Sequence, residues 1–291
     1  MALKTILWNC ASLRTGADQS QDKALYFEKE HKKNFQVAFF VETHHKSLAD
    51  ITPEILRYQT DYHIVHSPVS NGETHAGIIG LISNKYTLIE TKELLPGRIL
   101  NIKIRALEDN VDHNLTAVYF ETNNKLTKDK ITKAVSLIKD EIQGHTNNML
   151  LGDFNFIDHE KDKSKGLNPT DRLISKVWIP FLAETDMVDP FREQNPNRKI
   201  WSFVGSGAAG NSRIDRVYVN TVDTNYCTNI HYTPTSFGGH KLLSFFKNAP
   251  KERGKGYYKM NTSIIPDPKF RELVLETLRE IGSLKPGRRH S

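Results

Sequence analysis

Apolar runs that end in polar residues are the main pattern in this chain. Residues 149–155, MLLGDFN, place three apolar residues before Gly152, after which Asp153 and Asn155 alternate with Phe154. A run of this kind followed by period-two alternation predicts a buried strand that presents polar groups at its end. Asp153 and Asn155 then share one face, while Phe154 points into the core. Asp and Asn are also common where a strand enters a turn, so this stretch alone fits either a turn or a site.

Two earlier strands end in the same way. Residues 4–9 form an apolar strand that stops at Asn9, and residues 37–43 contain five apolar residues before Glu42. Asn9 on its own is better explained as a turn former. A Glu placed after five apolar residues is costly to bury without a metal or a cation as partner. Glu42 therefore favours a functional site over a structural role.

Further strands and helices follow from the spacing of apolar residues and from glycine and proline punctuation. Tyr119 closes one of the strands, where an aromatic residue is commonly structural. The predicted strands cover residues 62–69, 77–83, 86–95, 98–106, 114–120, 201–204, 212–219, 225–233 and 242–246. The predicted helices cover residues 21–35, 128–143 and 171–186. The buried sides of the last two helices are predicted as Ile131, Ala134, Val135, Ile138, Ile142 and as Leu173, Val177, Phe181, Leu182.

Two more polar groups lie beside predicted strands near the end of the folded region. Arg213 and Asp215 share one face of the 212–219 strand, where an exposed ion pair of little energetic value is the simplest explanation. His240 follows Gly238 and Gly239 and precedes an apolar strand, so backbone can approach a ligand closely there. A single His is more often structural, but here it joins other polar strand ends.

Many strands, few helices and polar strand ends predict stacked sheets with a site along one edge. Carboxylates together with Asn and His suit a hard divalent cation such as Mg²⁺, which binds through carboxylates and a substrate phosphate. An Asp that activates water, a metal on the phosphate and a His that stabilises developing charge would form a phosphodiesterase site. The residues expected to converge are Asn9, Glu42, Tyr119, Asp153, Asn155, Asp215 and His240.

Composition adds limits rather than a function. The 291 residues carry 40 Lys+Arg against 34 Asp+Glu, a net charge of +6 that moderately favours an anionic partner. Cys10 and Cys227 are too few for a disulfide framework and indicate a reducing compartment. Neither a transmembrane run nor a signal peptide is evident.

We expect a catalytic domain over 1–249, followed by a basic linker and a helix over 250–291. The helix is expected to start at Asp267 and Pro268. Its apolar stripe consists of Phe270, Leu273, Val274 and Ile281.

An ordered set of short motifs resembles the endonuclease/exonuclease/phosphatase superfamily. The motifs are LWNC at 7–10, VETH at 41–44, AVY at 117–119, LGDFN at 151–155, SRIDR at 212–216 and GH at 239–240. The closest resemblance is to the AP-endonuclease-like endonuclease domain of LINE-type non-LTR retrotransposons. SRIDR and the sequence GYYKMNTS at 256–263 favour that branch, since the latter resembles the segment before the reverse transcriptase.

The resemblance implies a four-layer α/β sandwich, with two mainly antiparallel sheets face to face and helices outside, as in DNase I-like proteins. It implies that Glu42 binds Mg²⁺ with Asn9 nearby, with Mn²⁺ as a substitute, and that Asp153 orients or deprotonates water. Asn155 and Tyr119 would hold the phosphate, and Asp215 would fix the tautomer of His240. The product would be a nick in double-stranded DNA whose 3′-hydroxyl primes reverse transcription in the nucleus. The implied partner is the reverse transcriptase region of the same polyprotein, and the isolated domain would be a monomer.

Two departures from the family pattern affect this expectation. The family usually has Ser-Asp-His where this chain has Gly238-Gly239-His240, so an Asp near the metal is missing. Its loss removes one charge and one oxygen ligand and should weaken metal binding or change which metal position is used, while the Asp215–His240 pair is retained. After Tyr119 the chain has Phe120-Glu-Thr-Asn123, where the family often has Ala-Pro-Asn.

Other functions remain open on the sequence alone. A repair AP endonuclease would prefer abasic DNA, a phosphatase would act on inositol lipids or other small phosphoesters, and a decayed, non-catalytic module would bind duplex without nicking it. Contacts to DNA are expected from polar and basic loop residues, although a solvated surface role is the simpler explanation for each. The expected contacts are Arg14, Lys46, Asn123, Lys125 and Arg213, with Lys163, Lys165 and Arg198 as further basic candidates.

Overall fold

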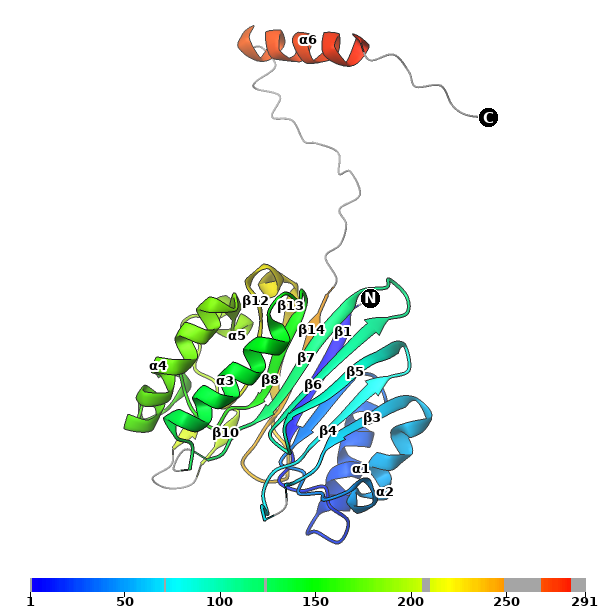
Figure 1. The fold of residues 1–291 in the computed structure, drawn as a ribbon, viewed down its shortest axis with the longest axis vertical. Helices are drawn as coiled ribbons and strands as arrows, with labels where there is room; N and C mark the ends of the chain where they lie inside the picture. The colour runs from blue at the N-terminus through cyan, green and yellow to red at the C-terminus, as the bar shows by residue number, and fades with distance from the viewer. Residues whose placement is uncertain (1, 71, 123–124, 206–209, 249–267, 284–291) are drawn as a thin grey trace. The chain divides into compact units, whose positions relative to one another are not determined.

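The fold was analysed in a computed structural model (Figure 1). Contacts divide the chain into two units, residues 1–250 and residues 251–291, and each is described by itself. The structure describes residues 2–70, 72–122, 125–205, 210–248 and 268–283, with the side chains of the last segment described to residue 276.

The first of two large sheets contains the first and the last strand of the larger unit. Its strand order is β13-β14-β1-β2-β4-β3, six strands within the described residues. β1 and β2 are parallel and the other neighbours are antiparallel. The strands are β1 Leu3–Asn9, β2 Val37–Val41, β3 Tyr62–Ser67, β4 Ile78–Ser83, β13 Cys227–Thr233 and β14 Leu242–Lys247.

The second large sheet has the order β5-β6-β7-β8-β12-β9, again six strands in the described part of the chain. β7 and β8 are parallel, and the remaining pairs are antiparallel. These strands are β5 Tyr86–Leu95, β6 Ile99–Ala106, β7 Asp112–Tyr119, β8 Asn148–Asp153, β9 Met187–Val188 and β12 Asp215–Asn220. A separate two-stranded ribbon pairs β10 Phe203–Val204 with β11 Asn211–Ser212.

Helices of the larger unit cover the outer faces of the two sheets (Figure 1). Thr127 caps α3 by accepting a hydrogen bond from the Lys130 amide, and Asn168 forms a capping box with Asp171 at the start of α4. The helices are α1 Ser20–His31, α2 Pro53–Leu56, α3 Lys128–Ile142, α4 Pro169–Glu184, α5 Pro190–Gln194 and α6 Pro268–Ser283. Short 3₁₀ turns are η1 Leu48–Asp50, η2 Arg57–Thr60, η3 Glu160–Asp162 and η5 Thr221–Tyr226.

Three buried clusters hold the layers together. One lies between the sheets, where Leu7 of β1 and Phe39 of β2 join Leu151 of β8. The neighbouring residue Trp8 points to the other face and packs with α1 and α2, because side chains alternate along a strand. A third cluster packs α3 and α4 on the outer face of the second sheet, around Trp178. The predicted four-layer α/β sandwich is confirmed.

Several predicted details were wrong. The helix over 171–186 begins at Pro169, and its buried side is formed by Ile174, Trp178 and Phe181, whereas Leu173 is 43% exposed. The expected strand over 212–219 is interrupted after Ser212, since the chain leaves the β11 ribbon before it enters β12. Pattern reasoning also missed α2, α5 and β9, which are too short to show a period.

The smaller unit is described only over α6. Its helix begins at Pro268 as predicted, while Asp267 and residues 256–263 lie outside the described residues. Leu273 is 61% exposed and Val274 is 38% exposed. Over the described part of the chain, no helix has both the length and the apolar character needed to cross a lipid bilayer.

Candidate active site

Strand register brings three predicted residues together in the second sheet. Tyr119 at the end of β7 lies opposite Asp153 of β8, because the two strands run parallel. Asp153 also lies opposite Asp215, the first residue of the antiparallel strand β12. Asp153 and Asp215 are fully buried, and Tyr119 is 3% exposed. Two carboxylates thus occupy neighbouring positions at one end of this sheet.

Asn9 joins this group to the first sheet. It lies opposite Val41 in the β1–β2 register, next to Glu42. Its side-chain nitrogen Nδ2 lies 2.8 Å from Glu42 Oε2 and 2.8 Å from Asp153 Oδ2. Since an amide group carries two hydrogens, Asn9 donates one to each carboxylate. One side chain therefore connects acidic groups from both sheets.

His240 completes the group from the segment before β14. Its Nδ1 lies 2.9 Å from Asp215 Oδ2, so Nδ1 carries the hydrogen that the carboxylate accepts. Its Nε2 lies 3.4 Å from Asn9 Nδ2 and 3.9 Å from Asp153 Oδ2. The ring of Phe203 packs against the imidazole with 4.8 Å between ring centres. The imidazole is thus held at Nδ1 and by packing, with Nε2 directed toward Asn9 and Asp153.

Asn155 and Tyr119 orient the two carboxylates. The Asn155 backbone amide donates to Asp153 Oδ1 at 2.9 Å, and its Nδ2 lies 3.3 Å from Asp153 Oδ2. Asn155 has φ 54°, a left-handed conformation that Asn adopts more readily than most residues. The Tyr119 hydroxyl bonds to Glu42, and the Arg98 guanidinium lies 5.0 Å from the Tyr119 ring centre.

The proximity of these groups changes their protonation. Burial and the neighbouring Asp215 raise the pKa of Asp153 to about 7. Burial alone would lower the pKa of His240, but the charge and hydrogen bond of Asp215 outweigh it and raise that pKa to about 9. Burial works against ionisation of Glu42, yet hydrogen bonds from His44, Asn9 and Tyr119 hold its pKa below the ordinary value. Burial beside Glu42 raises the pKa of Tyr119, so its hydroxyl is neutral.

A cavity of about 420 Å³ opens over these side chains, a volume in the range of small-molecule sites. Side chains from both sheets and from the segment around β10 line it, including Glu42, Tyr119, Asp153, Asn155, Ile214 and His240.

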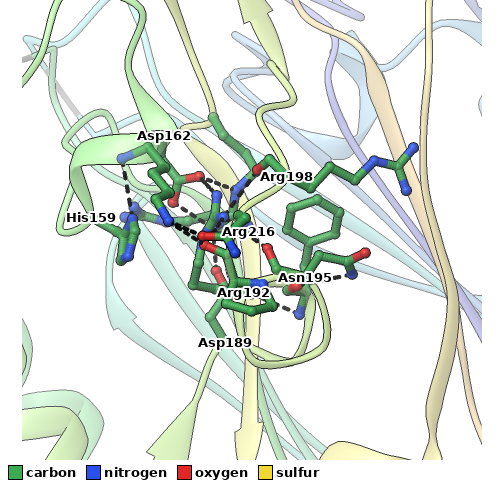
Figure 2. A network of polar contacts seen from close by, with 12 residues as sticks. His159, Asp162, Asp189, Arg192, Asn195, Arg198 and Arg216 are labelled. Carbon is green, nitrogen blue, oxygen red and sulfur yellow. Dashed lines mark hydrogen bonds and ion pairs between the residues drawn. The ribbon is translucent and has the colours of Figure 1, made fainter.

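Arg213 lies away from this cavity, in a buried ionic network. Figure 2 shows this network around Asp162, Asp189 and Arg192. Its side chain is 1% exposed. It donates to Asp162 through Nε at 2.8 Å and Nη2 at 2.6 Å, and Nη2 also lies 2.5 Å from Asp189 Oδ2. Arg192 binds the same Asp162. The prediction that Arg213 contacts DNA is wrong, because its guanidinium is buried. It joins η3 and the start of α5 to the segment that precedes Asp215.

The other predicted DNA contacts differ in position. Arg14, Lys46 and Lys125 are exposed, and Asn123 lies outside the described residues. Lys163 lines the cavity, but its Nζ lies 2.5 Å from the buried Asp171 Oδ2. Lys165 and Arg198 are exposed.

Two groups of side chains have the composition and spacing to hold a metal ion, within the described residues. One is Asp153, Asp215 and His240, and the other is Glu42, His44 and His75. In the first group, the hydrogen bond between His240 and Asp215 already accounts for the short distances.

Comparison with solved structures places the fold. An AP endonuclease from Leishmania major matches with a TM-score of 0.67 and 17% identity, over 86% of this chain and 88% of that one. The chain has the fold of the AP endonucleases. A 3′ phosphatase from Neisseria bound to a product DNA hairpin matches with a TM-score of 0.65 and 15% identity, over 84% and 98% of the two chains. The endonuclease domain of a telomere-specific non-LTR retrotransposon matches with a TM-score of 0.61 and 14% identity, over 85% and 99%.

No protein-family model and no curated protein sequence matches the chain. The shared fold is therefore established by structure at low sequence identity.

Within this AP endonuclease fold, the local structure explains why position 239 is a glycine. Its carbonyl accepts a hydrogen bond from the Val204 amide at 2.9 Å. A Cβ at position 239 would lie 2.8 Å from the Phe203 ring and 2.8 Å from the Val204 carbonyl oxygen. Close approach of β10 thus occupies the space that an Asp side chain would need.

Sequence reasoning missed several residues around the site. Ser202 Oγ accepts hydrogen bonds from the Ile214 and Asp215 amides, each at 2.9 Å, and so fixes the start of β12. His44 and His75 lie beside Glu42. His44 follows Glu42 by two positions, the same spacing that drew attention to Asp153 and Asn155, whereas nothing in the sequence marked Ser202 or His75.

Proposed function

We propose that this chain is a divalent-metal-dependent DNA endonuclease that hydrolyses a phosphodiester bond in one strand of double-stranded DNA. The observation that carries the proposal is the meeting of Glu42 and Asp153 on the Asn9 amide, at 2.8 Å each, beside the Asp215–His240 pair. The AP endonuclease fold supports it, because two of its structural neighbours are named as endonucleases and a third is a 3′ phosphatase bound to a product DNA hairpin.

The residues present fit a Mg²⁺ ion. Mg²⁺ takes hard oxygen ligands and usually binds through one or two carboxylates plus substrate phosphate. Glu42 and Asp153 offer such oxygens, and with Asp215 they place three carboxylates around the single imidazole of His240. That excess of negative charge favours a dication. Glu42 would hold the ion with Asn9 nearby, and when bound the ion would polarise the phosphate, a role that Mn²⁺ could also fill.

The protein's own groups would handle the protons. Asp153 is held by Asn9 and Asn155 with its pKa raised to about 7, which suits a base that takes a proton from an attacking water. The water oxygen would then bond to phosphorus as the bond to the 3′-oxygen breaks, and the 3′-oxygen would take up a proton from solvent water to become the 3′-hydroxyl. His240, with its pKa at about 9, would donate from Nε2 to a phosphate oxygen as charge develops.

We further propose that the nick serves target-primed reverse transcription by a retrotransposon. A product with a 3′-hydroxyl is a primer that a reverse transcriptase can extend. Support comes from the SRIDR and GYYKMNTS motifs and from the likeness to a retrotransposon endonuclease domain. On this proposal the partner is the reverse transcriptase region of the same polyprotein, and the site of action is the nucleus.

A repair AP endonuclease is the second candidate, favoured by the match to the Leishmania enzyme. Competition between an intact duplex and the same duplex with one abasic site separates the two. We expect nicks at preferred sequences in intact DNA, with ends that a polymerase extends directly. Cleavage confined to the abasic site would favour repair, and ends that a polymerase cannot extend would remove the priming role.

A further inference from the structure

A cluster of two histidines and one glutamate lies at the edge of the cavity. His44 Nε2 is 3.5 Å from Glu42 Oε1, and His75 Nδ1 is 3.4 Å from His44 Nε2. One ligand atom from each of the three residues lies within 4.8 Å of the others. Glu42 meets this cluster through Oε1, whereas its Oε2 faces Asn9. The carboxylate thus has two distinct sides.

We propose that Glu42, His44 and His75 form a second metal site, which binds a transition-metal dication of the Zn²⁺ and Co²⁺ class. Two imidazole nitrogens and one carboxylate oxygen are a ligand set that such ions prefer and that Mg²⁺ does not. The site is separate from the all-oxygen position proposed for Mg²⁺, with Glu42 shared between the two.

The spacing of the ligand atoms fits this chemistry. Ligands at 2.0–2.1 Å from a tetrahedral Zn²⁺ lie about 3.3–3.4 Å apart. The two measured separations, 3.4 Å and 3.5 Å, are close to that edge length. The ligand atoms of Glu42 and His75 lie within 4.8 Å of each other, and His75 is exposed, so its side chain has room to adjust that distance.

The backbone around the cluster is held in place before any ion binds. Glu42 has φ 59° and His44 has φ 60°, left-handed conformations that are strained for these residues. The His44 amide donates to the Ala76 carbonyl at 2.8 Å, and Arg98 Nη2 donates to the His75 carbonyl at 2.8 Å. These contacts fix the two histidine backbones side by side and bring their rings to 4.9 Å between centres. Preorganised ligands lose less entropy when a metal binds.

Cobalt binding to the metal-free full chain tests the proposal. Co²⁺ is titrated in the presence of excess Mg²⁺, without DNA, and the visible d–d absorption of the bound Co²⁺ is recorded. Wild type is expected to bind one equivalent that His75→Ala and His44→Ala lose, with at least a tenfold rise in the dissociation constant. His231→Ala, which removes an exposed histidine from β13, is expected to bind as wild type does.

The result does not depend on whether the chain nicks DNA, since no DNA is present. Equal Co²⁺ binding by wild type and His75→Ala overturns the proposal, because the ion then occupies another position such as Asp153, Asp215 and His240. Absence of Co²⁺ binding by wild type also overturns it and leaves the contact between His44 and His75 as a hydrogen bond. Should His44→Ala fail to fold, His75→Ala decides, because His75 is exposed.

Discussion

At the scale of single residues, the pKa values of His240 and Asp153 are both raised, but to different values. Asp215 raises the pKa of His240 from 6.5 to about 9, so the imidazolium persists through neutral pH. Burial and Asp215 raise the pKa of Asp153 to about 7, so its carboxylate form needs a pH above that value when no cation is near. An acid and a base with separated pKa values suit general acid–base chemistry.

The pH profile of nicking should reflect this pair. We expect the rate to rise as Asp153 loses its proton and to fall as His240 loses its own near pH 9; bound Mg²⁺ shifts the rise below pH 7 by favouring the carboxylate. In Asp215→Asn the fall should move about 1–3 pH units lower. Initial rates and the NMR titration of His240 measure both limbs. A fall that stays near pH 9 in Asp215→Asn would contradict the proposed role of Asp215.

The same pKa shift affects stability. The pKa of His240 is higher in the folded protein than its ordinary value of 6.5. Its contribution to the free energy of unfolding is therefore fully present below pH 6.5 and is lost as the pH rises to about 9.

The sequence revealed three of these residues because each follows an apolar strand. Asn9, Glu42 and Asp153 are polar groups placed where burial is expected, whereas Asp215 was marked only by its place beside Arg213 on one strand face. Arg213 obeyed the same pattern, but its partners Asp162 and Asp189 lie 51 and 24 positions away in the chain, so its burial could not be foreseen. The pattern of apolar and polar positions can identify a polar residue that is expected to be buried. Only the tertiary fold shows whether the partner of that residue is a ligand or another side chain.

At the scale of elements, β10 lies close to residues 238–240. This close approach explains why position 239 is a glycine and not the Asp that the family usually has. We expect Gly239→Asp to lower both stability and nicking rather than to restore a metal ligand, because its Cβ would meet Phe203 and Val204 at 2.8 Å. Ser236→Asp is the matched control, since it adds the same charge at an exposed position of the same segment, whereas Gly238 has φ 70° and any side chain there would be strained. Faster nicking by Gly239→Asp than by wild type would contradict this expectation, because it would mean that residues 238–240 and β10 move apart to admit the Asp side chain.

The ionic network in Figure 2 ties η3, the start of α5 and the segment before β12 to one another. Arg213→Met should destabilise the protein by about 3–5 kcal/mol, because it leaves the buried Asp162 and the partly buried Asp189 short of a cation. Arg198→Ala, at an exposed position, should change stability by less than about 0.5 kcal/mol. Urea unfolding compares them, and similar midpoints for the two variants would contradict the role assigned to Arg213.

Strand and helix positions were largely predictable, whereas pairing was not. Residues 86–95 and 128–143 were found almost to the residue, since their periodicity is long and regular. The sequence could not show that β1 lies between β2 and β14, because pairing depends on contacts between distant segments. It is this pairing that brings Asn9 to Asp153, 144 positions away.

At the scale of the whole molecule, we propose that residues 1–249 form the catalytic domain. Contacts separate the chain close to this boundary, after residue 250. A chain ended at residue 249 should unfold cooperatively and nick DNA, since the site residues all precede that point. Thermal unfolding and plasmid nicking of the shortened and full chains test this. Loss of folding in the shortened chain would show that the remaining residues contribute to the domain.

We propose that Asn9, Glu42, Asp153 and His240 together form a metal-dependent phosphodiesterase site. Its most direct test is the conversion of supercoiled plasmid to nicked circles in Mg²⁺, with EDTA and Asp153→Ala as controls. We predict that wild type nicks, that EDTA stops the reaction, and that Asp153→Ala is slower by a factor of at least about 10². Binding of DNA by wild type without nicking in Mg²⁺ or Mn²⁺, or equal rates for wild type and Asp153→Ala, would contradict the claim.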